Sequence, residues 1–394
     1  MKILMINTVC GFGSTGRICT DLAEILERQG HQVKIAYGRG VVPHQYQKYA
    51  VRIGSELDVK LHALKARIFD CAGFGSRRVT KAFIQWIKDY DPDIIHLHNL
   101  HGYYLNVEVL FNYLATCKKK IFWTLHDCWA FTGHCAHYSA IGCDLWKTKC
   151  MKCPQKMNYP QSIFLSKASD NYQKKKILFT LPEKMTLITP SNWLAEQTRE
   201  SFLRKYPVRV IPNGVDLNRF RPIENKLRKQ YNIETEKIIL GVASVWDERK
   251  GLKDFIKLNN ILDKPYKIVL IGITKKQKGK IPKDILCIER TSNISELAQW
   301  YTVADVFVNP SVEETMGLTT VEALACGTPV ITYNQTAVPE VVDSTCGMVV
   351  ECRPELIAEV VGSVQYDSSA CRLRAENYEK NQQYMKYIHL YIEK

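Results

Sequence analysis

The sequence lacks a long hydrophobic run. No apolar stretch reaches the roughly 18 residues that a membrane-spanning helix needs, so we predict no transmembrane segment. Residues 1–7 are too short and too soon interrupted to be a signal peptide, and we interpret them as a first strand. Composition is also unbiased. With 46% hydrophobic and 24% charged residues, it excludes collagen, low-complexity disorder and a disulfide miniprotein. At about 150 residues per domain, 394 residues predict two to three domains.

Several familiar binding motifs are missing as well. No signature of a nucleic-acid-binding module is present, so we predict no nucleic-acid partner. Gly13, Ser14 and Gly16 follow the first strand, but no Gly-Lys-Ser/Thr completes a Walker loop. Gly11, Gly13 and Gly16 have G-x-G-x-x-G spacing, yet the second strand ends near Arg39 without the acid that binds ribose in NAD enzymes. A dehydrogenase is therefore disfavoured.

Positive charge is unevenly distributed. The chain has 54 Lys and Arg against 40 Asp and Glu, a net of +14. Residues 1–190 hold 26 of these cations and 14 of the anions, a net of +12, which leaves +2 for residues 191–394. Such a one-sided field attracts a polyanion or an anionic membrane surface. The clustered cations are Lys60, Lys65, Arg67, Arg77, Arg78, Lys81, Lys118, Lys119, Lys120, Lys174, Lys175 and Lys176.

Strands alternate with helices in both halves, which predicts parallel sheets covered by helices on both faces. The predicted strands are residues 2–7, 32–37, 93–98, 120–125 and 185–189, then 208–212, 238–243, 267–271, 286–288, 306–309 and 330–333. We predict an α/β protein with two Rossmann-like domains facing a cleft, over residues 1–205 and 206–370, with a C-terminal helix at 371–394. In such folds ligands bind at the carboxyl ends of strands and in clefts.

Fourteen cysteines without a secretory signal predict mostly reduced thiols. Four of them have the spacing C-x7-C-x6-C-x2-C in an insertion at about 128–160, and they are Cys135, Cys143, Cys150 and Cys153. Four thiolates close a tetrahedral structural zinc site, and C-x2-C is its usual anchor. A zinc ion would explain how so long a loop is ordered. Free thiols and disulfides remain alternatives.

The most informative segment follows the predicted strand at 306–309. Glu314 and Glu322 lie eight residues apart, the first at a loop end and the second two turns into a helix. Backbone N–H groups at a helix start, together with the helix dipole, favour an anion there. Two carboxylates beside an anion site make sense if they accept hydrogen bonds from sugar and ribose hydroxyls. The residues at this helix start are Thr315, Met316, Gly317 and Leu318.

Residues 310–330 resemble the E-x7-E signature of the family 4 retaining glycosyltransferases, which have the two-domain GT-B fold. Further matches lie in order along nearly the whole chain, at residues 13–16, 211–216, 220–222, 249–251 and 338–342. The His-Asp-Cys-Trp run at 126–129 and the four-cysteine insertion resemble bacterial O-antigen, capsule and exopolysaccharide glycosyltransferases. The resemblance implies that the first domain binds the acceptor, the second binds the nucleotide sugar, and the C-terminal helix packs back on the first domain.

The resemblance also implies individual roles. Glu314 would bind hydroxyls of the donor sugar, and Glu322 the ribose. Arg249 and Lys250 would hold the diphosphate, which suits two cations facing a leaving group that gains negative charge. His126 would contact the donor sugar and assist the reaction. Gly13, Ser14 and Gly16 would let the backbone approach the donor, as would the helix start at 315–318.

One departure from the family concerns the diphosphate-binding motif. The usual pattern is Gly-Arg-Leu before x-x-x-Lys-Gly, but Val245 stands at the usual arginine position in this chain. We therefore expect Arg249 to substitute. No Asp-x-Asp follows a strand, so we expect catalysis without a divalent metal and no catalytic cofactor.

Together these features predict a retaining hexosyltransferase that moves a sugar from a UDP- or GDP-sugar to a lipid diphosphate-linked saccharide. We expect it in O-antigen or capsule biosynthesis, in the cytoplasm and peripheral to the inner face of the membrane, on an anionic surface. Three alternatives are a GT-B sugar-nucleotide epimerase, a non-catalytic sugar-binding protein and a nucleic-acid binder that uses the basic half.

Overall fold

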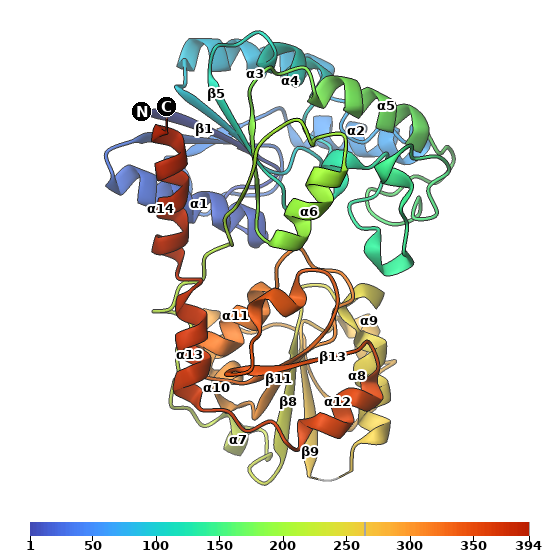
Figure 1. Ribbon diagram of the computed structural model, residues 1–394, viewed down its shortest axis with the longest axis vertical. Helices are drawn as coiled ribbons and strands as arrows, with labels where there is room; N and C mark the ends of the chain where they lie inside the picture. Colours follow the sequence, from blue (N-terminus) through green and yellow to red (C-terminus); the bar gives the residue numbers. More distant parts are fainter. Residues whose placement is uncertain (264, 394) are drawn as a thin grey trace. The chain divides into compact units, whose positions relative to one another are not determined.

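The structure is a computed structural model that describes residues 1–263 and 265–393. Its contacts divide the chain into two α/β units (Figure 1). Unit 1 is Met1–Pro212 together with the chain from Tyr384 onward, and unit 2 is Asn213–Gln383. No helix in the described part of the chain is long and apolar enough to cross a membrane.

Unit 1 contains a seven-stranded parallel sheet of order β3-β2-β1-β4-β5-β6-β7. The strands are β1 (Lys2–Asn7), β2 (Gln32–Tyr37), β3 (Ala50–Arg52), β4 (Ile94–Leu97), β5 (Lys120–Thr124), β6 (Thr186–Thr189) and β7 (Val208–Val210). The helices are α1 (Gly13–Arg28), α2 (Glu56–Phe69), α3 (Arg77–Tyr90), α4 (Val107–Leu114), α5 (Ala168–Phe179), α6 (Asn192–Glu200) and α14 (Lys380–Ile392).

Alternate residues of the unit 1 strands feed two different cores, as the period of a strand requires. Ile3 and Met5 of β1 pack with α1 and α14 on one face of the sheet. Leu4 and Ile6 pack with α2 to α6 on the other face. Both faces are therefore covered, which is why β1 is apolar from Ile3 to Ile6.

Unit 2 contains a six-stranded parallel sheet of order β10-β9-β8-β11-β12-β13. The strands are β8 (Lys237–Val242), β9 (Tyr266–Ile271), β10 (Leu286–Ile288), β11 (Val306–Asn309), β12 (Val330–Tyr333) and β13 (Gly347–Val350). The helices are α7 (Leu227–Gln230), α8 (Leu252–Ile261), α9 (Lys275–Lys278), α10 (Ile294–Val303), α11 (Leu318–Ala325), α12 (Pro354–Val361) and α13 (Ser368–Glu376). Its core again has two halves, one with α10, α11 and α13 and one with α8 and α12.

The boundary between the units differs from the one predicted at residues 205 and 206. Residues 208–210 form β7, which pairs with β6 and completes the first sheet. The boundary therefore lies at Pro212 and Asn213.

The predicted C-terminal helix is two helices in different units. α13 belongs to unit 2 and packs on α11, whereas α14 belongs to unit 1 from Tyr384 onward. The Tyr391 hydroxyl lies 2.6 Å from His96 Nδ1, and Lys120 Nζ donates to the Tyr391 carbonyl oxygen at 3.1 Å. These contacts join α14 to the first sheet, and the chain from Tyr384 onward is part of unit 1 (Figure 1).

Candidate functional site

The carboxyl ends of strands in unit 2 carry the predicted donor residues. The loop after β11 leads into α11, whose first helical residue is Leu318. The Asn309 amide holds this loop, because Nδ2 donates to Thr320 Oγ1 at 3.0 Å and Oδ1 accepts from Ser311 N at 3.2 Å. Glu314 lies in the loop, and Glu322 lies within α11.

Lys250 and Glu314 come together in an ion pair, although they are 64 residues apart in the chain. The short 3-10 turn at Glu248–Lys250 brings Lys250 to this position. Its backbone lies against the loop after β11, since Val312 N donates to the Arg249 carbonyl at 2.9 Å. Gly251 permits the close approach, because it has φ +73° and an added Cβ would lie 2.6 Å from Pro310.

Each predicted glutamate has a partner that the sequence spacing does not reveal. Ser311 Oγ donates to Glu314 Oε1 at 3.3 Å, and Glu314 N donates to Thr336 Oγ1 at 3.0 Å. The Tyr301 hydroxyl lies 2.9 Å from Glu322 Oε2. Burial raises the pKa of Tyr301 well above its usual value, so the hydroxyl stays protonated and donates to the carboxylate.

Arg249 does not join Lys250 at Glu314. Its guanidinium contacts Asp247 Oδ2 through Nη2 at 2.9 Å and Nε at 3.2 Å. Val245, at the family's usual arginine position, is exposed. Of the two predicted cations, Lys250 therefore pairs with the Glu314 carboxylate, and Arg249 does not.

The glycine loop of unit 1 begins α1. Gly13 has φ +64° and is exposed with Ser14, and the Gly11 N–H donates across the loop to the Gly16 carbonyl at 3.1 Å. Gly16 is buried, and an added Cβ would lie 3.0 Å from Val9. Gly13 and Ser14 are thus exposed at the start of α1, whereas Gly16 allows the loop to pack.

His126 follows β5 at the carboxyl edge of the unit 1 sheet, and its Nε2 lies 3.0 Å from Nδ1 of His98, which follows β4. Burial lowers the pKa of His126 to about 4, although Asp127 opposes the shift. Burial, with His96 and His126 nearby, also lowers the pKa of His98 far below its usual value. His126 is therefore neutral at neutral pH and is available for hydrogen bonds but carries no charge.

A third histidine at this edge, His101, forms a pair with Asp127. His101 Nε2 lies 2.6 Å from Asp127 Oδ2, and its Nδ1 lies 2.9 Å from the Tyr159 hydroxyl. Burial alone would raise the pKa of Asp127, but His101 holds it well below its usual range. Tyr159 belongs to the cysteine-rich insertion, so its hydrogen bond with His101 ties the insertion to this edge of the unit 1 sheet. The sequence could have predicted the His101–Asp127 pair, because polar residues that follow neighbouring parallel strands meet at the same edge of the sheet.

Comparison with known proteins agrees with this geometry. The model of the family described as Glycosyltransferase Family 4 matches residues 15–219, and that described as Glycosyl transferases group 1 matches residues 236–365. The chain belongs to glycosyltransferase family 4. The two matched segments fall almost wholly in unit 1 and unit 2 respectively.

Named relatives and a solved structure are similar to most of this glycosyltransferase. It is 24% identical to an Escherichia coli K12 protein provisionally named as the colanic acid biosynthesis glycosyl transferase WcaC, over 99% of both chains. It is 28% identical to the Escherichia coli O-antigen biosynthesis glycosyltransferase WclY, over 71% of both chains. The structure of Anabaena HepE in complex with UDP and glucose shares the fold, with a TM-score of 0.67 at 14% identity over 99% of both chains.

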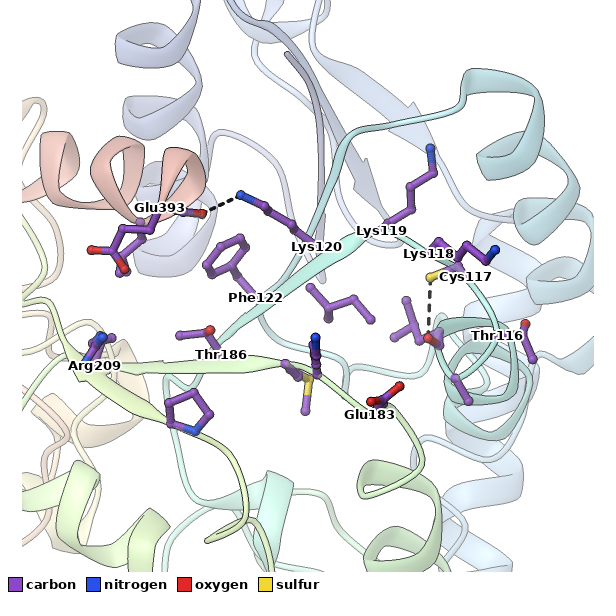
Figure 2. A pocket seen from close by; sticks show the side chains of 17 residues that line it. Thr116, Cys117, Lys118, Lys119, Lys120, Phe122, Glu183, Thr186, Arg209 and Glu393 are labelled. Atoms are coloured by element: carbon purple, nitrogen blue, oxygen red, sulfur yellow. Dashed lines mark hydrogen bonds between the residues drawn. The ribbon is translucent and has the colours of Figure 1, made fainter.

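Unit 1 of the glycosyltransferase also has a large basic cavity, at the opposite edge of its sheet from His98 and His126. It has a volume of about 660 Å³ and is lined in part by residues at the amino ends of β5 and β6 (Figure 2). Its cationic lining residues include Lys118, Lys120 and Arg209. Lys120 is occupied by the carbonyls of Tyr391 and Glu393. Because ligands of parallel sheets bind at the opposite, carboxyl edge, we do not place the donor or acceptor here.

The four cysteines of the insertion line one small pocket together with His134. The Cys135 thiol hydrogen-bonds Cys153, and His134 Nδ1 lies 2.5 Å from Asp70 Oδ1. His134 Nε2 is buried without a hydrogen-bond partner in the structure. Among residues 1–263 and 265–393, however, no three His, Cys, Asp or Glu side chains are arranged to hold a metal ion. The zinc site therefore stays a prediction.

We expect the purified glycosyltransferase to carry about one equivalent of zinc per chain if Cys135, Cys143, Cys150 and Cys153 bind it, because closed thiolate sites bind zinc tightly. Metal analysis measures this directly. Replacing Cys143 and Cys150 with serine should then remove the metal, whereas replacing Cys71, outside the cluster, should not. Metal-free protein whose four thiols all react normally would exclude the site.

Proposed function

We propose that this protein is a retaining glycosyltransferase that moves a sugar from a UDP- or GDP-sugar to a lipid-linked saccharide during cell-surface polysaccharide biosynthesis, such as that of O-antigen or capsule. The observation that carries the proposal is the Lys250–Glu314 pair, with Glu322 one turn into α11, on the carboxyl edge of the unit 2 sheet. The named relatives, in colanic acid and O-antigen biosynthesis, support the process. The complex of HepE with UDP and glucose supports a nucleotide-sugar donor.

In this proposal the unit 2 residues bind the donor. Glu314 accepts hydrogen bonds from sugar hydroxyls, and Lys250, already beside it, meets the diphosphate. Glu322 accepts from the ribose hydroxyls while Tyr301 holds its other side. The backbone at Thr315–Leu318 and the α11 dipole favour the diphosphate charge. Arg249 would have to leave Asp247 to join Lys250.

The reaction follows from these contacts. The bond from the anomeric carbon to the diphosphate oxygen breaks, and the acceptor oxygen bonds the same carbon on the same face. The acceptor proton passes to the departing diphosphate oxygen. Lys250 stabilises the charge that grows on that leaving group, an effect that is strongest in a site closed to water. Configuration is retained without a covalent protein intermediate, a catalytic metal or another cofactor.

The basic first unit supports a membrane-borne acceptor. A lipid diphosphate-linked saccharide is anionic and lies at a bilayer surface, and residues 1–190 carry a net charge of +12. Of the clustered cations, Lys175 cannot contribute to a membrane-facing surface, because it is buried. Its Nζ donates to the Trp129 carbonyl at 2.8 Å and to the Thr132 carbonyl at 3.1 Å. We place the enzyme in the cytoplasm, peripheral to the inner face of the membrane.

Nucleotide sugars should raise the melting temperature, because a ligand that binds only the folded state at about 100 times its Kd adds about 2.7 kcal/mol. A thermal-shift screen of UDP- and GDP-sugars identifies the donor, and the Glu322→Gln variant should lose much of the shift. Transfer to an extracted lipid-linked acceptor, with the anomeric configuration read by NMR, then tests the reaction. Isomerised donor would indicate an epimerase, and binding without turnover would indicate a sugar-binding protein. Either result would overturn the proposal.

A further inference from the structure

Helix α2 has an exposed face that is apolar. Leu57, Leu61 and Leu64 follow one another at helical spacing, and all three are exposed, Leu57 by 65%. The opposite face is buried through Val59, His62 and Ala66. A surface helix of a globular protein usually presents polar residues outward, so this leucine stripe has no role in the core of unit 1.

The chain after the cysteine-rich insertion continues this apolar surface. Ile163 N donates to the Arg67 carbonyl at 2.7 Å, and Leu165 N donates to the Ile68 carbonyl at 3.3 Å. Residues 162–165 therefore lie along the last turn of α2. Ile163, Phe164 and Leu165 are all exposed, Phe164 by 69%, as is Phe69 at the end of the helix. We call α2 together with residues 162–165 the α2 surface.

Cations are interspersed with these apolar side chains. Lys60, Lys65 and Arg67 are exposed on α2, and Lys167 is exposed just after residue 165. The two acids of α2 lie in its first turn, where Glu56 pairs with Arg52 and Asp58 caps the helix through Ser55. Along the rest of α2, the charged side chains are all positive. The α2 surface is therefore both apolar and basic.

Exposed apolar residues are concentrated in the same half of the chain as the positive charge. Of the twenty large hydrophobic side chains exposed in the structure, thirteen lie between Leu57 and Leu181, in the half that carries the net charge of +12. Pairing with a second copy of the chain would place Lys and Arg against Lys and Arg. An anionic bilayer instead takes the apolar side chains between its headgroups and the cations at the headgroup level.

We propose that the α2 surface docks on an anionic lipid bilayer, with the leucines of α2 and Phe164 inserted at the depth of the headgroups. This deepens the proposed function, because it says which face of the enzyme meets the membrane that holds the acceptor. Apolar insertion is not screened by salt, whereas the contribution of the lysines is. Binding should therefore weaken with salt but persist in part.

The test is sedimentation with vesicles of phosphatidylcholine, alone and mixed with phosphatidylglycerol, over a range of salt. The full chain carrying Leu61→Ser, Leu64→Ser and Phe164→Ser should bind the mixed vesicles at least about tenfold more weakly, since three inserted side chains are lost. The control is Leu373→Ser, which changes a leucine that is 66% exposed in α13 of unit 2 and should leave binding unchanged. Lys60→Glu with Lys65→Glu should remove the preference for phosphatidylglycerol. A Leu61→Trp variant should shift its fluorescence to the blue on mixed vesicles.

Three results would overturn the proposal. One is equal vesicle binding by the parent and the triple variant, and another is binding that ignores phosphatidylglycerol. The third is a dimeric parent that the triple variant makes monomeric, which would assign the surface to a second copy of the chain. Failure of the proposed function looks different, because vesicle binding would then persist while no nucleotide sugar shifts the melting temperature.

Discussion

Replacing Lys250 with alanine is expected to lower the rate of sugar transfer about 10²–10³-fold, the usual cost of removing one preorganised charge contact from a catalytic site. Glu314→Gln should have an effect of similar size, because the neutral amide neither pairs with Lys250 nor accepts as strongly from sugar hydroxyls. Steady-state kinetics with the donor identified by thermal shift measure both. Near-normal turnover in either variant would remove that residue from the site.

The matched control for Lys250 is Lys253, three residues further along. It also forms an ion pair, with Glu248, but both side chains are mostly exposed to solvent. Exposed pairs contribute little, so Lys253→Ala should leave transfer and stability nearly unchanged. Lys250→Ala leaves the half-buried Glu314 without its cation, so its melting temperature must be compared with that of Lys250→Arg, which keeps a cation. If the Lys250→Ala variant is folded but binds no donor, its loss of transfer activity is due to lost donor binding.

Much of the fold follows from sequence periodicity. The predicted strands at 2–7 and 32–37 coincide with β1 and β2, because short, mostly apolar runs that end at polar or glycine-rich turns are typical of strands in a covered parallel sheet. Helix α2 has no such signal, since its apolar residues point both inward and outward and blur the helical period. The outward-facing leucines that make α2 hard to predict from the sequence are the same residues that form the α2 surface.

The candidate site was predictable only where its residues share a motif. Glu314 and Glu322 stand at a fixed spacing, and Lys250 precedes a glycine that the close approach to Pro310 requires. Tyr301 and Thr336 have no such signal, because Tyr301 reaches Glu322 from helix α10 and Thr336 reaches Glu314 from the loop after β12. The direction of the Arg249 side chain is likewise decided by a neighbour, Asp247, and not by spacing.

The buried pair of Asp70 and His134 is expected to be the strongest single anchor of the cysteine-rich insertion. Their side chains are only 2% and 1% exposed, and Asp70 Oδ2 also accepts from Lys167 N at 2.6 Å. Asp70 thus holds the insertion near both its beginning and its end. Removing the Asp70 carboxylate leaves two donors without their acceptor, the His134 ring and Lys167 N, and each buried donor left unsatisfied typically costs about 1–3 kcal/mol, or about 2–6 kcal/mol for both. We expect Asp70→Ala to lower the free energy of unfolding by that amount.

Asp91 supplies the matched control, because it too ends a helix in the left-handed conformation, with φ 49° against 51° for Asp70, and pairs with a cation, Lys119. The strain of alanine at positive φ is thus common to both variants and cancels in their difference. Asp91 is 72% exposed, so its pair contributes at most about 1 kcal/mol.

Urea unfolding followed by tryptophan fluorescence measures the difference, since Trp129 and Trp146 are buried in the insertion. Limited proteolysis should cut Asp70→Ala within residues 128–160 faster than Asp91→Ala. Equal losses in the two variants would mean that the insertion is held by its other contacts, among them the Tyr159–His101 hydrogen bond and the two carbonyls bound by Lys175.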